Sequence, residues 1–321
     1  HVDGVSVKGK GLRELIGMIG GLRGSRVKLS ILRPRSNKTL RVVLIRALMP
    51  RPNVVGFTLP GQIGYVRLRQ FKGGSSLQIR EELARLRRAV KGNLQGLILD
   101  LRSNPGGRVS EAVNIASLFL EQGDVVTYAG ANTKRRTHKV KPGRTEELYP
   151  LIVLLNGYSA SASELLSGAL QNHGRALILG RQSYGKGTVQ NMIDLNKIIS
   201  GNTYGDLGAM KLTTDKFYRI NGGSTQLEGV KSDVIFPNRY SYIEVGEKDQ
   251  ENPLKWDKIT PAFYETFINE ERFLSIVEKS NKRLESNPYV KLIDELFTVN
   301  KYSFDSITSD IAPNTSGNQF L

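Results

Sequence analysis

The sequence predicts an α/β fold, and three observations support this class. Strand-like apolar runs alternate with helical patterns between residues 63 and 180, and such alternation is typical of α/β cores. The run LQGLILDL at 94–101 is apolar almost throughout, as expected of a strand that is buried on both faces of a sheet. Glycine-rich turns such as RSNPGG at 102–107 separate the segments, so short and closely connected elements are expected.

The first 47 or so residues are expected to form a small β-rich module. VDGVSV at 2–7 indicates a strand. LRELIGMI at 12–19 predicts a helix, because it places four apolar residues on one face: Leu12, Leu15, Ile16 and Ile19. Alternating apolar residues at 27–33 and 40–47 predict two further strands. Prolines at positions 50 and 52 mark a linker to the next region.

The central region is predicted to contain five strands, at 63–68, 94–101, 124–128, 151–155 and 176–180. Three helices are predicted between them. Ser75 and Ser76 are expected to cap the first, and a third helix is expected at 161–172. The apolar faces of the first two helices consist of Ile79, Leu83, Leu86 and Val90, and of Val109, Val113, Ala116 and Leu120.

From about Tyr240 the strand signals end, and a helical C-terminal region is predicted. The apolar residues at helical spacing are Phe263, Phe267, Phe273, Ile276, Val277, Leu284, Leu292, Leu296 and Val299. The last 15 or so residues are rich in Ser, Asp, Asn and Thr, so a loose tail is expected there.

The composition excludes several kinds of site. The chain has no cysteine, which rules out disulfides, thiolate zinc sites and cysteine nucleophiles. No apolar run reaches the ~18 residues that cross a bilayer. The net charge of +16 is spread along the chain, and its densest cluster, at 134–144, lacks interleaved aromatics. We therefore expect an exposed basic loop and no nucleic-acid partner. The chain opens at HVDGVSV without methionine, so a piece of a longer protein is expected.

The stretch ILGRQSYGKGTVQ at 178–190 offers Lys186 two roles. A phosphate-binding loop has the pattern G-x4-G-K followed by Ser or Thr, and two glycines precede Lys186 at that spacing. Gly187 follows the lysine, however, and the next residues are β-like instead of starting a helix, so this role is rejected. The other role is that of a general base, because a lysine in a partly apolar site loses its proton more easily.

Proton chemistry at Lys186 needs a nucleophile, and the candidate is Ser161. NGYSASASELL at 156–166 follows an apolar strand and runs into a helix, and backbone N–H groups at such a turn can stabilise an oxyanion. Ser161 followed by Glu164 also fits a capping box, so the residues alone leave cap and nucleophile open. His173 is a rival base, but a rise of ~1.5 Å per residue places it at the far end of the helix.

Three motifs in one order resemble the tail-specific proteases, also called C-terminal processing peptidases: DLRSNPGG at 100–107, NGYSASASELLSGALQNHGRA at 156–176 and SYGKGTVQ at 183–190. Residues 216–237 extend the similarity, and residues 246–259 are typical of the long periplasmic branch of the family. The first 47 residues resemble the C-terminal part of its PDZ domain. The resemblance implies an α+β protease core at 48–240, with a mixed sheet and flanking helices. A partial PDZ domain at 1–47 and a helical C-terminal region at 241–321 would flank this core.

Transferred residue by residue, the resemblance makes Ser161 the nucleophile, Lys186 its general base and Gln190 the residue that positions the lysine. The period of two along a strand would place Lys186 and Gln190 on one face. The oxyanion hole is expected from the backbone N–H groups of Ala162 and Gly107. The resemblance thus implies a serine endopeptidase without metal or cofactor, in which the pKa of Lys186 lies well below the usual ~10.4.

The PDZ-like module implies how substrates are chosen, because such domains bind a free C-terminus as a strand beside a helix. The helix with Leu12, Leu15, Ile16 and Ile19 would form the peptide-binding groove. Expected partners are proteins or peptides with apolar C-termini, together with an adaptor protein. The resemblance also implies a periplasmic location with association with the inner membrane. The alternative is a proteolytically inactive peptide-binding or adaptor protein on the same fold.

Overall fold

The computed structural model describes residues 1–298 apart from gaps at 34–37, 49–50, 131–132, 144–146, 200, 202, 204, 238–244, 263, 265, 267–269, 294 and 297. The expected tail, together with Phe263, Phe267 and Val299, lies outside the described residues. The chain divides into two compact units, His1–Pro52 and Asn53–Leu321, and each is described here by itself.

The N-terminal unit contains one helix and a two-stranded sheet. Helix α1 (Leu12–Ile19) precedes strands β1 (Arg26–Arg33) and β2 (Lys38–Ile45), which pair antiparallel. The helix and both strands confirm the prediction, whereas the prediction of a strand at 2–7 is wrong. Asp3 and Gly4 have positive φ angles of 48° and 86°, so the chain turns there and makes only isolated bridges. Among the described hydrophobic residues of this unit, only Val2 and Val27 are buried.

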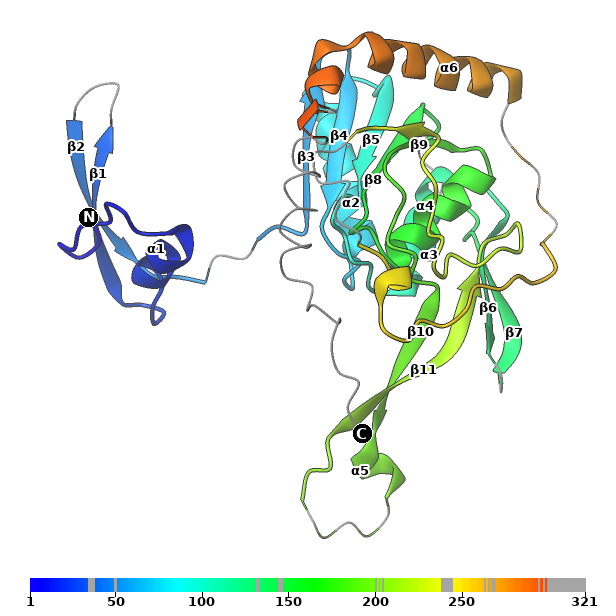
Figure 1. The fold of residues 1–321 in the computed structure, drawn as a ribbon, viewed down its shortest axis with the longest axis horizontal. Helices are drawn as coiled ribbons and strands as arrows, with labels where there is room; N and C mark the ends of the chain where they lie inside the picture. Colours follow the sequence, from blue (N-terminus) through cyan, green and yellow to red (C-terminus); the bar gives the residue numbers. More distant parts are fainter. Residues whose placement is uncertain are drawn as a thin grey trace, which may run out of the picture. The chain divides into compact units, whose positions relative to one another are not determined.

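The second unit is built on a six-stranded mixed sheet (Figure 1). Its strands, in spatial order, are β12 (Val234–Ile235), β9 (Ala176–Gly180), β8 (Leu151–Leu155), β5 (Gly96–Asp100), β4 (Ile63–Leu68) and β3 (Val54–Leu59). Only β3 pairs antiparallel to its neighbour; the other pairs are parallel. The sheet confirms the predicted α/β class, and β3 is an additional edge strand that the sequence analysis did not identify.

Three helices, α2 (Ser75–Ala89), α3 (Val109–Phe119) and α4 (Ala162–Asn172), contribute buried apolar residues to the same core as the strands of this sheet. The predicted apolar face of α2 is confirmed, since Ile79, Leu83 and Leu86 are completely buried. The predicted cap of α2 by serines is wrong. Ser75 Oγ donates backwards to a loop carbonyl, and the N-terminal N–H groups of α2 are bound instead by the buried carboxylate of Glu111 on α3.

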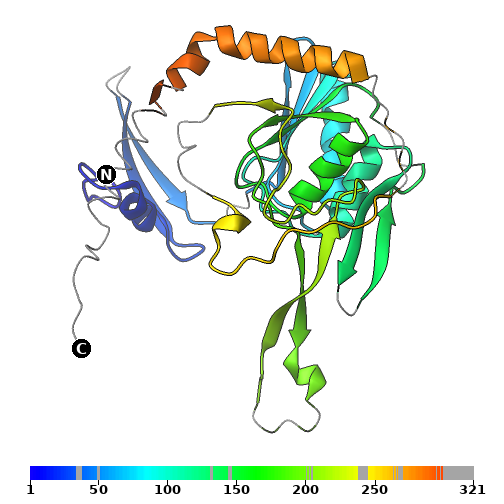
Figure 2. The same cartoon turned by 45° about the vertical axis from the view of Figure 1, so that its right-hand side comes forward.

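A second sheet of four antiparallel strands lies beside the core. Its order is β10 (Thr188–Asp194), β11 (Ala209–Tyr218), β6 (Asp124–Gly130) and β7 (Thr133–Lys139). The β10–β11 hairpin carries the short helix α5 (Leu195–Ile198) and projects from the body of this unit (Figures 1 and 2).

The basic cluster that was predicted to be a loop is largely the edge strand β7. Charge does not prevent this conformation, because the lysines and arginines of β7 are exposed while its backbone pairs with β6. The His138 ring is also exposed and packs edge-on against Tyr128, with 5.1 Å between the ring centroids. Exposed charged residues along the whole strand are typical of an edge strand.

The C-terminal region begins with the short 3-10 turn η1 (Glu247–Asp249) and continues to helix α6 (Glu270–Ser286). Helix α6 was predicted from the spacing of Phe273, Ile276, Val277 and Leu284. Within the described ranges, no helix combines the length and the apolar composition needed to cross a bilayer.

Candidate active site

The three sequence motifs follow three neighbouring parallel strands. Strand β5 ends at Asp100 and leads into the NPGG turn, β8 ends at Leu155 and leads to Ser161, and β9 ends at Gly180 and leads to Lys186. Because parallel strands present their carboxyl ends at the same edge, the three loops meet there. Register and strand order thus bring together residues that are 25 to 80 or so positions apart in the chain.

The nucleophile candidate lies in a strained turn. Ser161 has φ 55° and ψ −114° immediately before helix α4, a backbone conformation that costs a residue with a Cβ of order 1–3 kcal/mol. The Ser161 N–H donates to Glu164 Oε2 at 2.7 Å, so the predicted capping interaction is present as well. The cap holds the turn and does not exclude the nucleophile role.

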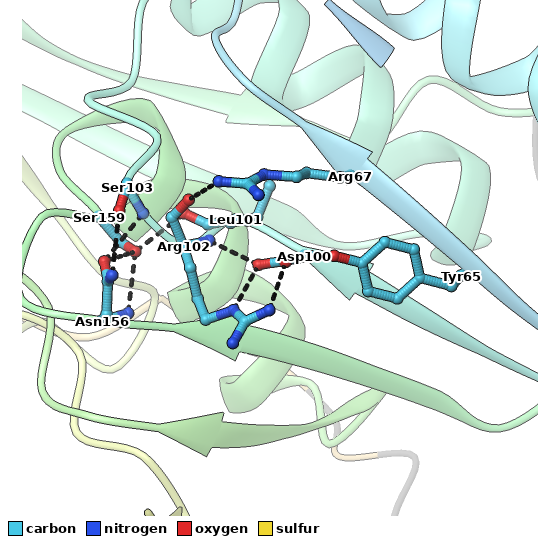
Figure 3. A network of polar contacts seen from close by, with 8 residues as sticks. All are labelled: Tyr65, Arg67, Asp100, Leu101, Arg102, Ser103, Asn156 and Ser159. Carbon is cyan, nitrogen blue, oxygen red and sulfur yellow. Dashed lines mark hydrogen bonds and ion pairs between the residues drawn. The ribbon is translucent and has the colours of Figure 1, made fainter. Parts of the chain in front are cut away.

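The NPGG turn and the serine turn are joined by buried hydrogen bonds. The carbonyl of Asn104 accepts from the N–H of Ala160 at 3.0 Å and from Ser163 Oγ at 2.9 Å. Ser159 Oγ donates to the carbonyl of Leu101 at 2.9 Å. Further out, the amide of Asn156 bonds both the N–H and the Oγ of Ser103 (Figure 3). The two loops therefore behave as one rigid piece.

The glycines of this piece allow a close approach that no other residue permits. A Cβ on Gly106 would lie 2.8 Å from the nitrogen of Ala162 and 2.8 Å from Ser161 Cβ. A Cβ on Gly107, whose φ is 140°, would lie 2.3 Å from the carbonyl oxygen of Phe71. In the part of the chain that the structure describes, neither the N–H of Gly107 nor that of Ala162 has an acceptor. Both expected oxyanion donors thus lie on the two joined turns and are available.

A charged network fixes the start of the NPGG turn (Figure 3). Asp100 is completely buried; it accepts from Arg102 Nε at 3.0 Å and Nη2 at 2.8 Å, and from the hydroxyl of Tyr65. Burial alone would raise the pKa of Asp100, but hydrogen bonds from Arg102 and Tyr65 outweigh it and hold the pKa below its ordinary value.

Lys186 and Gln190 are in direct contact. Lys186 Nζ donates to Gln190 Oε1 at 2.7 Å, and Gln190 Nε2 donates to Thr188 Oγ1 at 2.8 Å and to Thr213 Oγ1 at 3.2 Å. Burial lowers the pKa of Lys186, and the positive charge of Lys211 lowers it further. Both effects favour the neutral amine that a base requires. Ser161 and Lys186 both lie among the described residues, and no hydrogen bond joins Lys186 Nζ to Ser161 Oγ.

Glu164 connects the two halves of the site, the serine turn with its joined NPGG turn and the lysine loop. The sequence analysis missed this connection. The buried carboxylate of Glu164 accepts from Ser161 N on one side and, on the other, from Ser183 Oγ at 2.6 Å, Gly185 N at 2.6 Å and Lys186 N at 3.0 Å. Burial raises the pKa of Glu164 to about 7, and these donors oppose the rise. The Ser161–Glu164 spacing revealed the cap, but nothing in the sequence indicated the contacts with the lysine loop.

A cleft of about 990 Å³ lies beside these loops, and its lining includes Lys186 and the neighbours of Ser161 but not Ser161 itself. Lys186, Thr188 and Gln190 line it from the lysine loop and β10, and Pro105 and Ala160 line it from the two joined turns. A further side of the cleft is lined by Glu247, Gln250, Asn252, Pro253 and Leu254. His173 lies elsewhere, since its ring bonds the carbonyl of Asp124, so the exclusion of this rival base is consistent with the structure. Among the described side chains, no group of three or more His, Asp and Glu residues is arranged to hold a metal ion.

The expected peptide-binding residues lie on α1 of the N-terminal unit. Leu12 and Ile16 are 74% and 61% exposed, Ile19 is also exposed and Leu15 is half-buried. The helix therefore presents an apolar face to solvent, which a bound peptide would cover.

Comparisons with known proteins agree with this geometry. A model of peptidase family S41 matches residues 62–236, and a model of the C-terminal domain of tail specific protease matches residues 240–302. The tail-specific protease of Haemophilus influenzae is 35% identical over 80% of this chain, and the carboxy-terminal-processing protease of Bartonella bacilliformis is 34% identical over 79%. The chain spans only 37% and 58% of the length of these two relatives.

Among solved structures, the photosystem II D1 C-terminal processing protease is similar, with a TM-score of 0.50 and 29% identity. The match covers 74% of this chain and 62% of that one. It supports the same mixed α/β architecture that the sheet order shows. Because the peptidase model covers more than half of the 321 residues and carries all three loops of the site, the chain belongs to peptidase family S41.

Proposed function

We propose that this chain is the catalytic part of a serine endopeptidase with a Ser161/Lys186 dyad, which cleaves proteins selected by their C-terminal tails. The observation that carries the proposal is the meeting of three loops at the carboxyl edge of β5, β8 and β9. One loop offers a serine in a strained turn, one offers available N–H groups beside it, and one offers a lysine whose proton is destabilised. The relatives, a tail-specific protease and a carboxy-terminal-processing protease, support the same reaction class.

In the acylation step, the neutral amine of Lys186 takes the proton of Ser161 Oγ as that oxygen attacks the peptide carbonyl carbon. The carbonyl oxygen becomes an oxyanion and accepts from the N–H groups of Gly107 and Ala162. The Lys186 ammonium then gives its proton to the leaving amine, and an ester to Ser161 remains. Gln190 holds the amine before and between these transfers.

In the deacylation step, Lys186 takes a proton from water as the water oxygen attacks the ester carbonyl. The second tetrahedral intermediate collapses, the C–O bond to Ser161 breaks, and Ser161 Oγ regains a proton from Lys186. Both steps require the amine to reach hydrogen-bond distance of Ser161 Oγ, which means exchanging the contact with Gln190.

The dyad is tested by Ser161→Ala and Lys186→Ala, assayed on an unstructured protein substrate. Each variant is expected to lose cleavage by a factor of about 10³ or more, whereas Ser280→Ala and Lys197→Ala, outside the cleft, should leave it unchanged. Full cleavage by either pure dyad variant contradicts the proposal. A folded wild-type chain that neither cleaves nor reacts with a serine-directed phosphonate supports the alternative of an inactive binding protein.

Tail selection is proposed to depend on the PDZ-like N-terminal unit, with Leu12, Leu15, Ile16 and Ile19 contacting an apolar C-terminus. Leu12→Asp and Ile16→Asp are suitable tests, because both side chains are largely exposed and the changes should not unfold the unit. The variants should lose the preference for substrates that end in apolar residues over those that end in charged ones. Cleavage of a short peptide that does not end in apolar residues should not change. A preference that survives both variants excludes this groove.

The location is proposed to be the periplasm, in association with the inner membrane and with an adaptor protein. The support is the similarity of residues 246–259 to the long periplasmic branch and the match to the C-terminal domain of tail specific protease. Release of the protein by osmotic shock, followed by separation of membrane and soluble fractions, tests this location. Recovery with the cytoplasmic fraction would exclude it.

A further inference from the structure

Five residues of the segment 247–254 form a wall of the candidate cleft, although they lie in the part of the chain matched to the C-terminal domain: Glu247, Gln250, Asn252, Pro253 and Leu254. The N–H of Glu247 donates to the carbonyl of Tyr184 at 2.9 Å, and Gln250 Nε2 donates to the Tyr184 hydroxyl at 2.9 Å. Tyr184 stands two positions before Lys186. The C-terminal segment is therefore attached directly to the loop that carries the lysine.

A buried amide makes a second attachment. Gln226 is completely buried, and its Oε1 accepts from the N–H of Gly187 at 2.9 Å. Its Nε2 donates to the carbonyl of Leu254 at 3.0 Å and to Glu247 Oε1 at 3.3 Å. The side chain of Glu247 is thus held by a rigid group that also binds the residue after Lys186. Its carboxylate has a defined place relative to the amine.

The charges around the Lys186 amine come from three elements. Glu247 on η1 and Lys211 on β11 line the same cleft as Lys186, and the Glu164 carboxylate at the start of α4 accepts the backbone N–H of Lys186. The negative charges of Glu247 and Glu164 raise the pKa of Lys186, whereas Lys211 lowers it. Glu164 is fixed by four donors, so among the described residues that line the cleft, Glu247 and Lys211 are the charged side chains that accompany Lys186.

We propose that Glu247 and Lys211 are a pair of positioning residues of opposite charge that set the proton affinity of Lys186 across the cleft. Glu247 stabilises the ammonium that forms during proton transfer, and Lys211 destabilises it. The base strength of the lysine is therefore adjusted from the C-terminal domain on one side and from the β10–β11 hairpin on the other. The catalytic meaning of this pair rests on the proposed Ser161/Lys186 dyad.

The direction of each effect follows from the charge removed. Lys186 acts as a base when neutral, so activity rises with pH through its pKa. Glu247→Gln removes a negative charge, which should move the acid limb of kcat/KM to lower pH by about half a pH unit, given partial solvent screening. Lys211→Gln removes a positive charge and should move the limb to higher pH by a similar amount. The double variant should lie close to the wild type.

A matched control and a second readout separate this pair from a structural effect. Glu251→Gln removes the same charge from the same segment at an exposed position outside the cleft lining, and it should shift nothing. The neutral fraction of Lys186 is also read without any substrate, from the pH dependence of its acetylation by acetic anhydride followed by mass spectrometry. The two charge variants should shift this curve in opposite directions.

Shifts of the same sign, or equal shifts for Glu247→Gln and Glu251→Gln, overturn the inference. The labelling curve also keeps the two proposals distinguishable. If Ser161→Ala fails to abolish cleavage, the dyad is wrong, but opposite labelling shifts still establish the charge pair. If the dyad test succeeds and neither variant moves the labelling curve, the charge pair alone is rejected.

Discussion

Two buried carboxylates support the two halves of the site, and their surroundings are opposite. Asp100, at the end of β5, is paired with the guanidinium of Arg102 and the hydroxyl of Tyr65. Glu164, at the start of α4, accepts from three backbone N–H groups and one hydroxyl, and it forms no ion pair with a described side chain. Accordingly, the pKa of Asp100 is lowered, whereas burial raises the pKa of Glu164 to about 7.

The difference shows that equal burial serves two purposes here. The Asp100 network lies within one loop and its neighbouring strand, so it fixes the entry to the NPGG turn locally. Glu164 contacts two loops that belong to different strands, so it sets the position of the lysine loop relative to the serine turn. A carboxylate compensated by dipoles alone remains sensitive to pH near neutrality, whereas one paired with a guanidinium stays ionised.

The largest effect is expected from Glu164→Ala, which breaks the connection between the halves. Four donors lose their acceptor in a dry site, at a cost of about 3 kcal/mol or more in the free energy of unfolding. Displacement of the lysine loop should lower kcat by about 100-fold. The control is Asp233→Ala, which removes a carboxylate bound to Ile178 N and Gln171 Nε2. It should lower stability while leaving kcat within about threefold; equal kcat losses in both variants would deny Glu164 its special role.

The pH dependence of stability sharpens the comparison, because the two carboxylates should act with opposite sign. Glu164 has a folded pKa of about 7, above its ordinary 4.5. Its contribution is complete below the ordinary value and is lost as pH rises toward 7, by about 3 kcal/mol in total. Asp100 has a folded pKa below its ordinary 3.8, so its contribution is present above that pH and is lost as pH falls through the folded value.

The measurement is urea unfolding from pH 3 to 8, followed by the fluorescence of Trp256, the one tryptophan of the chain. Subtracting the curve of Glu164→Gln from that of the wild type should leave a stability difference that falls between pH 4.5 and 7. Subtracting that of Asp100→Asn should leave one that falls only on the acid side. If both stability differences changed with pH in the same direction, the environments of Asp100 and Glu164 would not differ as described.

The smallest effect on stability and kcat is expected from Ser103→Ala, because Ser103 lies at the exposed end of the loop that begins at Asp100. Ser103 Oγ accepts from Asn156 Nδ2 at 3.1 Å, and solvent can replace this bond. The cost should be about 0.5–1 kcal/mol with kcat nearly unchanged, as measured by the same unfolding and cleavage assays. A loss of kcat comparable to that of Glu164→Ala would mean that the outer contacts also control the NPGG turn.

The sequence predicted the strands that carry the site more completely than the contacts that stabilise it. Apolar runs predicted the strands that precede Ser161 and Lys186, and the resemblance to the tail-specific proteases assigned roles to these two residues and to Gln190, which lies within β10 of the second sheet. Ser161 and Lys186 themselves remain assignments that the dyad variants must test. Local patterns carried these predictions, because strands and turns are encoded within about ten residues.

The contacts that were missed are long-range. Glu164 contacts the lysine loop about 20 positions further along the chain. Gln226 contacts Gly187, which precedes it in the sequence, and Glu247 and Leu254, which follow it. Neither contact has a local pattern, since any buried polar residue in a strand end or helix start looks the same in the sequence. The basic run at β7 was misassigned for a related reason. Its pairing with β6 depends on a backbone partner, whereas the prediction weighed only its charge.

Strand β7 is the outer strand of its sheet, so one row of its backbone hydrogen-bonding groups faces outward. Two copies of the protein that met along this edge would bring the exposed cations Lys134, Arg135, Arg136 and Lys139 of each copy together. The repulsion between them opposes continuation of the sheet from molecule to molecule. Salt shortens the reach of this repulsion to about 10 Å at 0.1 M, so aggregation along this edge should grow with ionic strength.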